Sequence, residues 1–282
     1  MSKIIASIDG TTISNSVCDY GAWFSQKCAL PLTLLNVIEK VKIEAAHDWS
    51  GTIGIDSRKQ LLSELVELES AKSKVEMKHS TLLLQAAHNY VEQQHKITAD
   101  TLQKRGNLLE VVTELTDVDL LIMGKNGQKT EGQSTTIGTQ IENIARAFSH
   151  PILVCAQDFT APTSFLVAFD GSETSQQCIQ KIVQSAFLQG LACHIVYVGY
   201  PSDEIQKTLD DAKQLLSDHS WQVETHILSG DVEPTLLKYQ NDHAIDLMVI
   251  GAYGHSKIRQ FFIGSTTTKI LSASNKPIVL IR

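Results

Sequence analysis

The fold is decided by a stretch that occurs twice, as Val118-Asp-Leu-Leu-Ile-Met-Gly124 and as Ile245-Asp-Leu-Met-Val-Ile-Gly251. Each copy is an apolar run that ends at a glycine, which is typical of a strand buried on both faces of a sheet. A second matching pair follows, His150-Pro-Ile-Leu-Val-Cys155 and Lys276-Pro-Ile-Val-Leu-Ile281. The chain of 282 residues is therefore an internal duplication, and we expect two domains.

Three further predicted strands of the first half have counterparts in the second half. The first strands are 3–10 and 164–171, the second are 31–37 and 192–198, and the third are 97–103 and 222–228. The segments between them have helical spacing of apolar residues, and strands that alternate with helices indicate a parallel sheet covered on both faces. We therefore predict the α/β class, with two tandem Rossmann-like domains, 1–157 and 164–282, each a five-stranded parallel sheet. A short polar linker joins them.

The first half carries an extra segment of about residues 39–70 between its second and third strands. Its end, Leu61-Leu-Ser-Glu-Leu-Val-Glu-Leu68, has apolar residues at the spacing of an amphipathic helix. We expect an extra helix on the shared core, with a lid or a subunit contact as the alternatives.

Composition and net charge limit the kinds of partner that we expect the protein to bind. A formal net charge of -7 argues against nucleic acid and anionic membranes, which reward a basic surface. We expect neither a membrane span nor a signal peptide, because no apolar stretch approaches the length that spans a bilayer and residues 1–9 are too soon charged for a signal peptide. The five cysteines form no Cys-x-x-Cys pair, so we expect reduced, buried packing residues and a cytoplasmic protein; they are Cys18, Cys28, Cys155, Cys178 and Cys193.

The candidate site lies in the second half. In an open parallel sheet, ligands bind beyond the carboxyl ends of the strands where the winding reverses, here between the turn after Asp170 and the loop after Ile250. That loop is Gly251-Ala-Tyr-Gly254, followed after nine residues by Gly264-Ser265-Thr266-Thr267 at the start of a predicted helix. Glycines and free helix amides favour a phosphate, although glycines alone could equally form turns and Ser265 a helix cap.

This Gly-x2-Gly-x9-Gly-Ser/Thr pattern resembles the phosphate-binding signature of ATP-binding universal stress proteins, and the similarity extends over both halves. It includes Ser229-Gly-Asp-Val-Glu-Pro234, which is similar to a turn of that family. The resemblance implies ATP, or ADP or AMP, with or without Mg²⁺. It also implies that Asp170 contacts the adenosine and Val198 lines the base pocket. Phosphate contacts are implied for Gly251, Gly254, Gly264, Ser265 and Thr267, with Thr266 and His255 beside them.

The first half departs from this pattern. Its counterpart is Gly124-Lys-Asn-Gly127, then ten residues, then Gly138-Thr139-Gln140-Ile141. One residue is inserted, and Ile141 replaces the second hydroxyl. Asp9 and Val37 persist at the positions that match Asp170 and Val198, so a weaker site is conceivable. We expect a half that mainly pairs with its sibling through the last strands, as the resemblance implies, and two chains could pair again as a homodimer.

Enzyme signatures are mostly absent, including a Walker loop and a dinucleotide-binding Gly-x-Gly-x-x-Gly. No residue stands out as a general base. His79, His88 and His95 share one predicted helix, but helical histidines without a carboxylate or cysteine seldom bind zinc, so no metal site is predicted. The sequence favours a nucleotide-dependent regulatory module of the stress response. A slow ATPase or phosphotransferase and a scaffold for another small ligand remain the alternatives.

Overall fold

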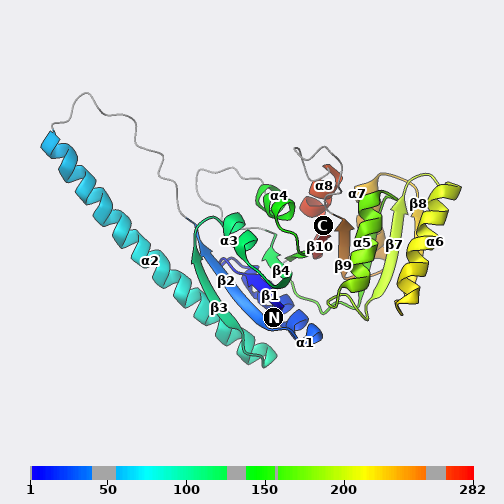
Figure 1. The fold of residues 1–282 in the computed structure, drawn as a ribbon, viewed down its shortest axis with the longest axis horizontal. Helices are drawn as coiled ribbons and strands as arrows, with labels where there is room; N and C mark the ends of the chain where they lie inside the picture. The colour runs from blue at the N-terminus through cyan, green and yellow to red at the C-terminus, as the bar shows by residue number, and fades with distance from the viewer. Residues whose placement is uncertain (1, 40–54, 126–137, 156–157, 252–264) are drawn as a thin grey trace.

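A computed structural model describes residues 2–39, 55–125, 138–155, 158–251 and 265–282. Strands and helices alternate through both halves (Figure 1). The first half contains β1 (Lys3–Ser7), α1 (Ser14–Cys28), β2 (Leu32–Ile38), α2 (Ile55–His95), β3 (Asp100–Arg105), α3 (Leu108–Glu114), β4 (Val118–Gly124), α4 (Gly138–Ala147) and β5 (Ile152–Cys155). The second contains β6 (Ser164–Phe169), α5 (Glu173–Gln184), β7 (Ala192–Val198), α6 (Asp203–Asp218), β8 (Val223–Leu228), α7 (Val232–Asp242), β9 (Leu247–Gly251), α8 (Ser265–Ala273) and β10 (Ile278–Ile281).

The strands form one sheet in the order β3-β2-β1-β4-β5-β10-β9-β6-β7-β8. Every neighbouring pair within a half is parallel, as predicted. The halves join where β10 and β5 pair antiparallel, with Val279 opposite Leu153. The last strands therefore make the contact that we expected between the halves.

The burial of each strand follows its place in the sheet. Central strands such as β4 and β9 are almost wholly buried, because helices cover both of their faces. The outermost strands, β3 and β8, are half-buried or exposed along their length. The third strand starts at Asp100 rather than at the predicted 97, because Lys96 turns the chain with φ 57 and Ala99 is buried in the connection.

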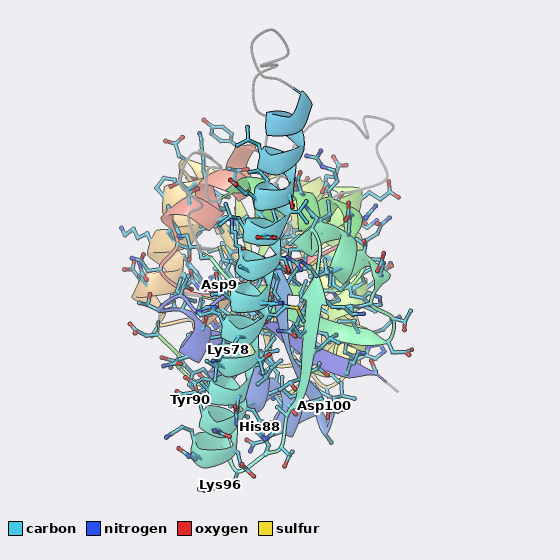
Figure 2. All side chains as sticks on the ribbon, turned by 90° about the vertical axis from the view of Figure 1, so that its left-hand side faces the viewer. Asp9, Lys78, His88, Tyr90, Lys96 and Asp100 are labelled. Carbon is cyan, nitrogen blue, oxygen red and sulfur yellow. The ribbon has the colours of Figure 1, made fainter. Side chains whose placement is uncertain are left out.

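The expected extra helix is part of a single longer one. α2 runs for 41 residues from Ile55 to His95, so the segment around 55–70 extends the crossover helix rather than adding another to the core. Residues 40–54 lie outside the described part of the chain. The later turns of α2 lie beside β3 and carry Lys78, His88 and Tyr90, while the first turns project beyond the sheet (Figures 1 and 2).

The cysteines behave as packing residues. All five are free thiols; Cys28 is half-buried and the other four are buried. Burial raises the pKa of Cys178 to about 12, which keeps its sulfur protonated at neutral pH. Across the described residues, none of the helices combines the length and apolar character that crossing a lipid bilayer would need.

Candidate functional site

A pocket of about 380 Å³ opens at the carboxyl ends of β6, β7 and β9. Its wall is apolar along β7 and β9, where it contains Val196, Val198 and Ile250. The first turns of α5 and α8 supply hydroxyl groups on opposite sides, and α7 closes the remaining side. The size and the mixture of an apolar wall with a few polar groups are those of a small-molecule site.

Asp170 lies at the rim of this pocket, directly after β6. Gly171 turns the chain at φ 77, which L side chains rarely adopt, so the Asp-Gly pair fixes the turn into α5. The Oδ1 atom of Asp170 accepts from the backbone N–H of Ser172 at 3.0 Å and from its hydroxyl at 2.6 Å. Asp170 therefore lines the pocket with its Oδ1 atom held by Ser172.

The start of α8 forms the opposite side. Thr266 and Thr267 line the pocket in the first turn of this helix, where backbone N–H groups lack intrahelical acceptors. Ile270, one turn later, closes the apolar floor. Hydroxyls and free amides at a helix N-terminus suit an anionic group.

Gly251 lines the pocket and also has a packing role. A Cβ atom at this position would lie 3.3 Å from the carbonyl oxygen of Thr174 and 3.4 Å from the Cβ of Cys178. The absence of a side chain therefore lets α5 approach β9 closely. The glycine serves the helix packing whether or not a phosphate binds beside it.

The predicted residues of the second half thus divide into two sets. The structure brings Asp170, Val198, Gly251, Thr266 and Thr267 to one pocket. Gly254, His255 and Gly264 lie outside the described residues, and Ser265 is described only as the first residue of α8. Ser172, Thr174 and Ser175 also line the pocket and were not predicted, although each follows the Asp-Gly turn closely.

In the first half, Asp9 repeats the turn: its Oδ1 accepts from the backbone N–H of Thr11 at 3.0 Å and from its hydroxyl at 2.7 Å. Val37 lies on β2 and Gly124 ends β4. Gly138 and Thr139 open α4, and Gly127 lies outside the described residues. Ile141, which matches Thr267, is 2% exposed and packs into the core around α4, so an apolar contact replaces the hydroxyl there.

Lys125, the residue after Gly124, contacts the second half of the chain. The ammonium group of Lys125 donates to the carbonyl oxygens of Ser272 at 2.7 Å and Ser274 at 2.8 Å, at the C-terminal end of α8. Thr268 of α8 donates to Glu142 of α4 at 2.6 Å. Sequence reasoning did not find these contacts, which hold α4 and α8 together across the junction of the halves.

Two of the three histidines of α2 have hydrogen-bond partners within the protein. His88 Nδ1 lies 2.8 Å from the carbonyl oxygen of Ala99, and His95 Nε2 lies 2.7 Å from Asp19 Oδ1. His79 is exposed. Within the described ranges none of the three belongs to a group of side chains with metal-ligand spacing.

Comparison with known proteins agrees with this architecture. Residues 1–156 and 163–282 each match the universal stress protein family. Universal stress protein Slr1230 of Synechocystis is 33% identical over 287 residues, which cover 100% of both chains, and universal stress protein MT2052 of Mycobacterium tuberculosis is 22% identical over 99% of this chain and 94% of its own. A crystal structure of a universal stress protein from Archaeoglobus fulgidus superposes with a TM-score of 0.66 at 18% identity, covering 99% of this chain and 96% of that one.

The fold thus defines a tandem α/β protein built from two copies of one domain. The chain belongs to the universal stress protein family.

Proposed function

We propose that this protein binds an adenine nucleotide, ATP in the first instance, in the pocket of its second half. The observation that carries the proposal is that pocket, with an apolar wall, an oriented carboxylate and a helix N-terminus around one volume of about 380 Å³. An adenosine phosphate needs these three surfaces, for its base, its ribose hydroxyls and its phosphates.

Each part of the ligand has a matching surface. The base packs against Val196 and Val198, because an aromatic ring gains from leaving water for an apolar wall. The ribose hydroxyls donate to Asp170. The phosphates lie at the start of α8, near Thr266 and Thr267, with Mg²⁺ bound to phosphate oxygens when the ion is present.

We infer that binding, rather than turnover, is the main activity. Asp170 is the sole carboxylate among the described lining residues, and those residues include no histidine or lysine. Its Oδ1 is already occupied by Ser172, so the described lining offers little general-base chemistry. Nucleotide occupancy can act on partners in a stress response through different affinities for two conformations. A slow ATPase or phosphotransferase is the competing function, and brisk ATP turnover by the wild-type chain would establish it.

The test compares the same substitution in the two halves. Asp170→Asn keeps the Oδ1 acceptor for Ser172 but removes the charge that the ribose meets, whereas Asp9→Asn makes this change at the matching turn of the first half. We expect Asp170→Asn to weaken ATP binding by about 1 kcal/mol, roughly fivefold, because a charged hydrogen bond becomes a neutral one. Isothermal titration calorimetry of each full-length variant measures this.

Asp9→Asn should leave the measured affinity close to the wild-type value. Equal losses in both variants would place the nucleotide in both halves. The proposal fails if the wild-type chain takes up no adenine nucleotide and millimolar ATP does not raise its melting temperature.

We further infer that two copies of the chain associate through α2. The outer face of this helix carries apolar side chains that are 47% to 68% exposed and follow a heptad spacing: Leu61, Leu65, Leu68, Val75 and Leu82. Such a stripe buries itself best against another helix with the same repeat. An antiparallel pairing of two such stripes buries both of them under one twofold axis. A second copy is therefore the partner that this face fits.

A further inference from the structure

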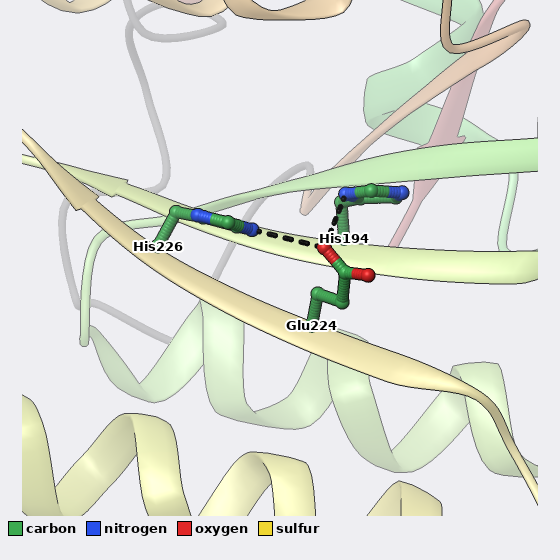
Figure 3. A group of neighbouring side chains, drawn as sticks. All are labelled: His194, Glu224 and His226. Atoms are coloured by element: carbon green, nitrogen blue, oxygen red, sulfur yellow. Dashed lines mark hydrogen bonds and ion pairs between the residues drawn. The ribbon is translucent and has the colours of Figure 1, made fainter. Parts of the chain in front are cut away.

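A cluster of possible metal ligands lies on the outer strands of the second half. His194 on β7 and Glu224 and His226 on β8 place their ligand atoms within 4.8 Å of one another. Figure 3 shows both imidazoles directed at one carboxylate oxygen of Glu224. His194 Nδ1 lies 3.8 Å from this Oε2 atom, and His226 Nε2 lies 3.3 Å from it. Across the described residues this is the one group with metal-ligand composition and spacing.

The sheet itself brings the three side chains together. His194 is paired in register with Glu224 on the neighbouring parallel strand. Glu224 and His226 are two residues apart, so both project from the same face of β8. Tyr239 of α7 packs over this face, with ring centroids 6.0 Å from His194 and 5.1 Å from His226. Two strands and a helix therefore fix the positions of these groups, which is what a selective site needs.

We propose that His194, Glu224 and His226 bind a divalent cation of the zinc class. Two imidazoles and a carboxylate are a common ligand set for Zn²⁺, at about 2.0–2.2 Å from the metal, which sets ligand atoms roughly 3.3–3.5 Å apart in a tetrahedron. The two distances to Glu224 Oε2 are already close to this value. Small side-chain rotations bring the remaining separation into range. His243, whose ring centroid lies 6.1 Å from those of both other imidazoles, or a water molecule takes the fourth position.

The surroundings of His194 favour its neutral imidazole, which is the form that binds a metal. Burial lowers the pKa of His194, and nearby His226 and His243 lower it further against the opposing effect of Glu224. The imidazole is therefore neutral at physiological pH, as coordination requires. The Tyr239 hydroxyl lies 3.0 Å from His194 Nδ1, and burial raises its pKa to about 12. The Tyr239 hydroxyl therefore stays protonated and does not act as a phenolate ligand. It competes with the metal for His194 Nδ1 by hydrogen bonding.

This site is separate from the nucleotide pocket. Val196 and Val198, on the same face of β7 as His194, line the pocket nearer the carboxyl end of the strand. The cation site lies further toward the amino end of the strand and shares no described lining residue with the pocket. It does not depend on the proposed nucleotide.

The test is equilibrium dialysis of the nucleotide-free, full-length chain against Zn²⁺. We expect one ion per chain at this site, and an affinity at least about tenfold lower in Glu224→Gln and in His226→Gln, since losing even an outer partner of a ligand costs that much. Glu224 is 66% exposed, so its substitution spares the fold. His219→Gln is the matched control, because His219 is exposed at the end of α6, and Asp170→Asn is the control for the pocket; both should bind Zn²⁺ like the wild type.

Co²⁺ provides a second readout that does not depend on affinity alone. Co²⁺ in the wild-type chain should show the visible absorption of a four-coordinate site, and Glu224→Gln should lose it. Tyr239→Phe should bind Zn²⁺ at least as tightly as the wild type, because the competing hydroxyl is gone. The proposal is overturned if the wild type binds no Zn²⁺, or if Glu224→Gln and His226→Gln both bind it as the wild type does.

Discussion

At the scale of single residues, the burial of His194 predicts that the second half is sensitive to acid. Burial is the largest cause of its lowered pKa. The carboxylate of Glu224 opposes this shift, whereas His226 and His243 add to it. The hydroxyl of Tyr239 also lies beside the His194 ring. The folded state therefore takes up a proton less readily than the unfolded state. The stability that this group contributes is present above the ordinary histidine pKa of about 6.5 and is lost as the pH falls through the lower folded-state value.

We therefore expect the free energy of unfolding of the metal-free wild type to fall more steeply between about pH 7 and pH 5 than that of His194→Gln. Urea unfolding in the presence of a chelator measures both slopes. His219→Gln is the matched control, because it makes the same substitution at an exposed position. Parallel slopes for His194→Gln and the wild type would contradict the prediction.

The same scale shows what the sequence could and could not predict about the sites. Asp170, Thr266 and Thr267 were predictable, because a turn after one strand and a loop after another meet at the carboxyl edge of a parallel sheet. Lys125 was not, because its acceptors lie 147 and 149 residues away in the other half. The proposed cation site left only a weak signal in the sequence, namely that Glu224 and His226 are two residues apart on a predicted strand. This spacing indicates a ligand group only once His194 is known to lie in register beside Glu224 on the neighbouring strand.

At the scale of elements, α2 departs most from the sequence prediction. The apolar periodicity of residues 61–68 predicted a helix. It could not show that this helix runs without a break into the crossover helix that follows, because periodicity alone does not tell one long helix from two consecutive ones. The buried contacts begin in its later turns, where Ser80 donates to Asn36 of β2. The earlier turns keep their leucines exposed, which favours a contact with another chain over one within this core.

We expect the double variant Leu65→Ala and Leu68→Ala to shift the chain from dimer to monomer, because it removes two apolar layers of the α2 contact while keeping strong helix formers. Val66→Ala is the matched control, since Val66 is 63% exposed on the same turns but lies off the heptad stripe. Sedimentation velocity over a range of protein concentrations separates the two states. A wild-type chain that stays monomeric at every concentration would contradict the proposed association.

At the scale of the whole molecule, ten strands form a single sheet whose direction reverses once, between β5 and β10. The duplication predicted both halves of this sheet, and the family resemblance predicted which strands meet. The side-chain contacts across the junction could not be predicted, because each joins residues that no local pattern relates. They give the first half a structural role: α4 and Lys125 hold α8, and the other end of α8 lines the pocket of the second half.

Lys125 should therefore stabilise the junction of the halves. Its ammonium group is partly buried, which lowers its pKa, and it donates to two carbonyl oxygens at the negative end of α8. Lys125→Met keeps the length of the side chain but leaves both carbonyls without this donor, so we expect the free energy of unfolding to fall by about 1–3 kcal/mol in urea. Lys207→Met, at an exposed position on α6, should change it by less than about 0.5 kcal/mol. If both variants unfold at the same urea concentration, the two Lys125 hydrogen bonds do not stabilise the junction of the halves.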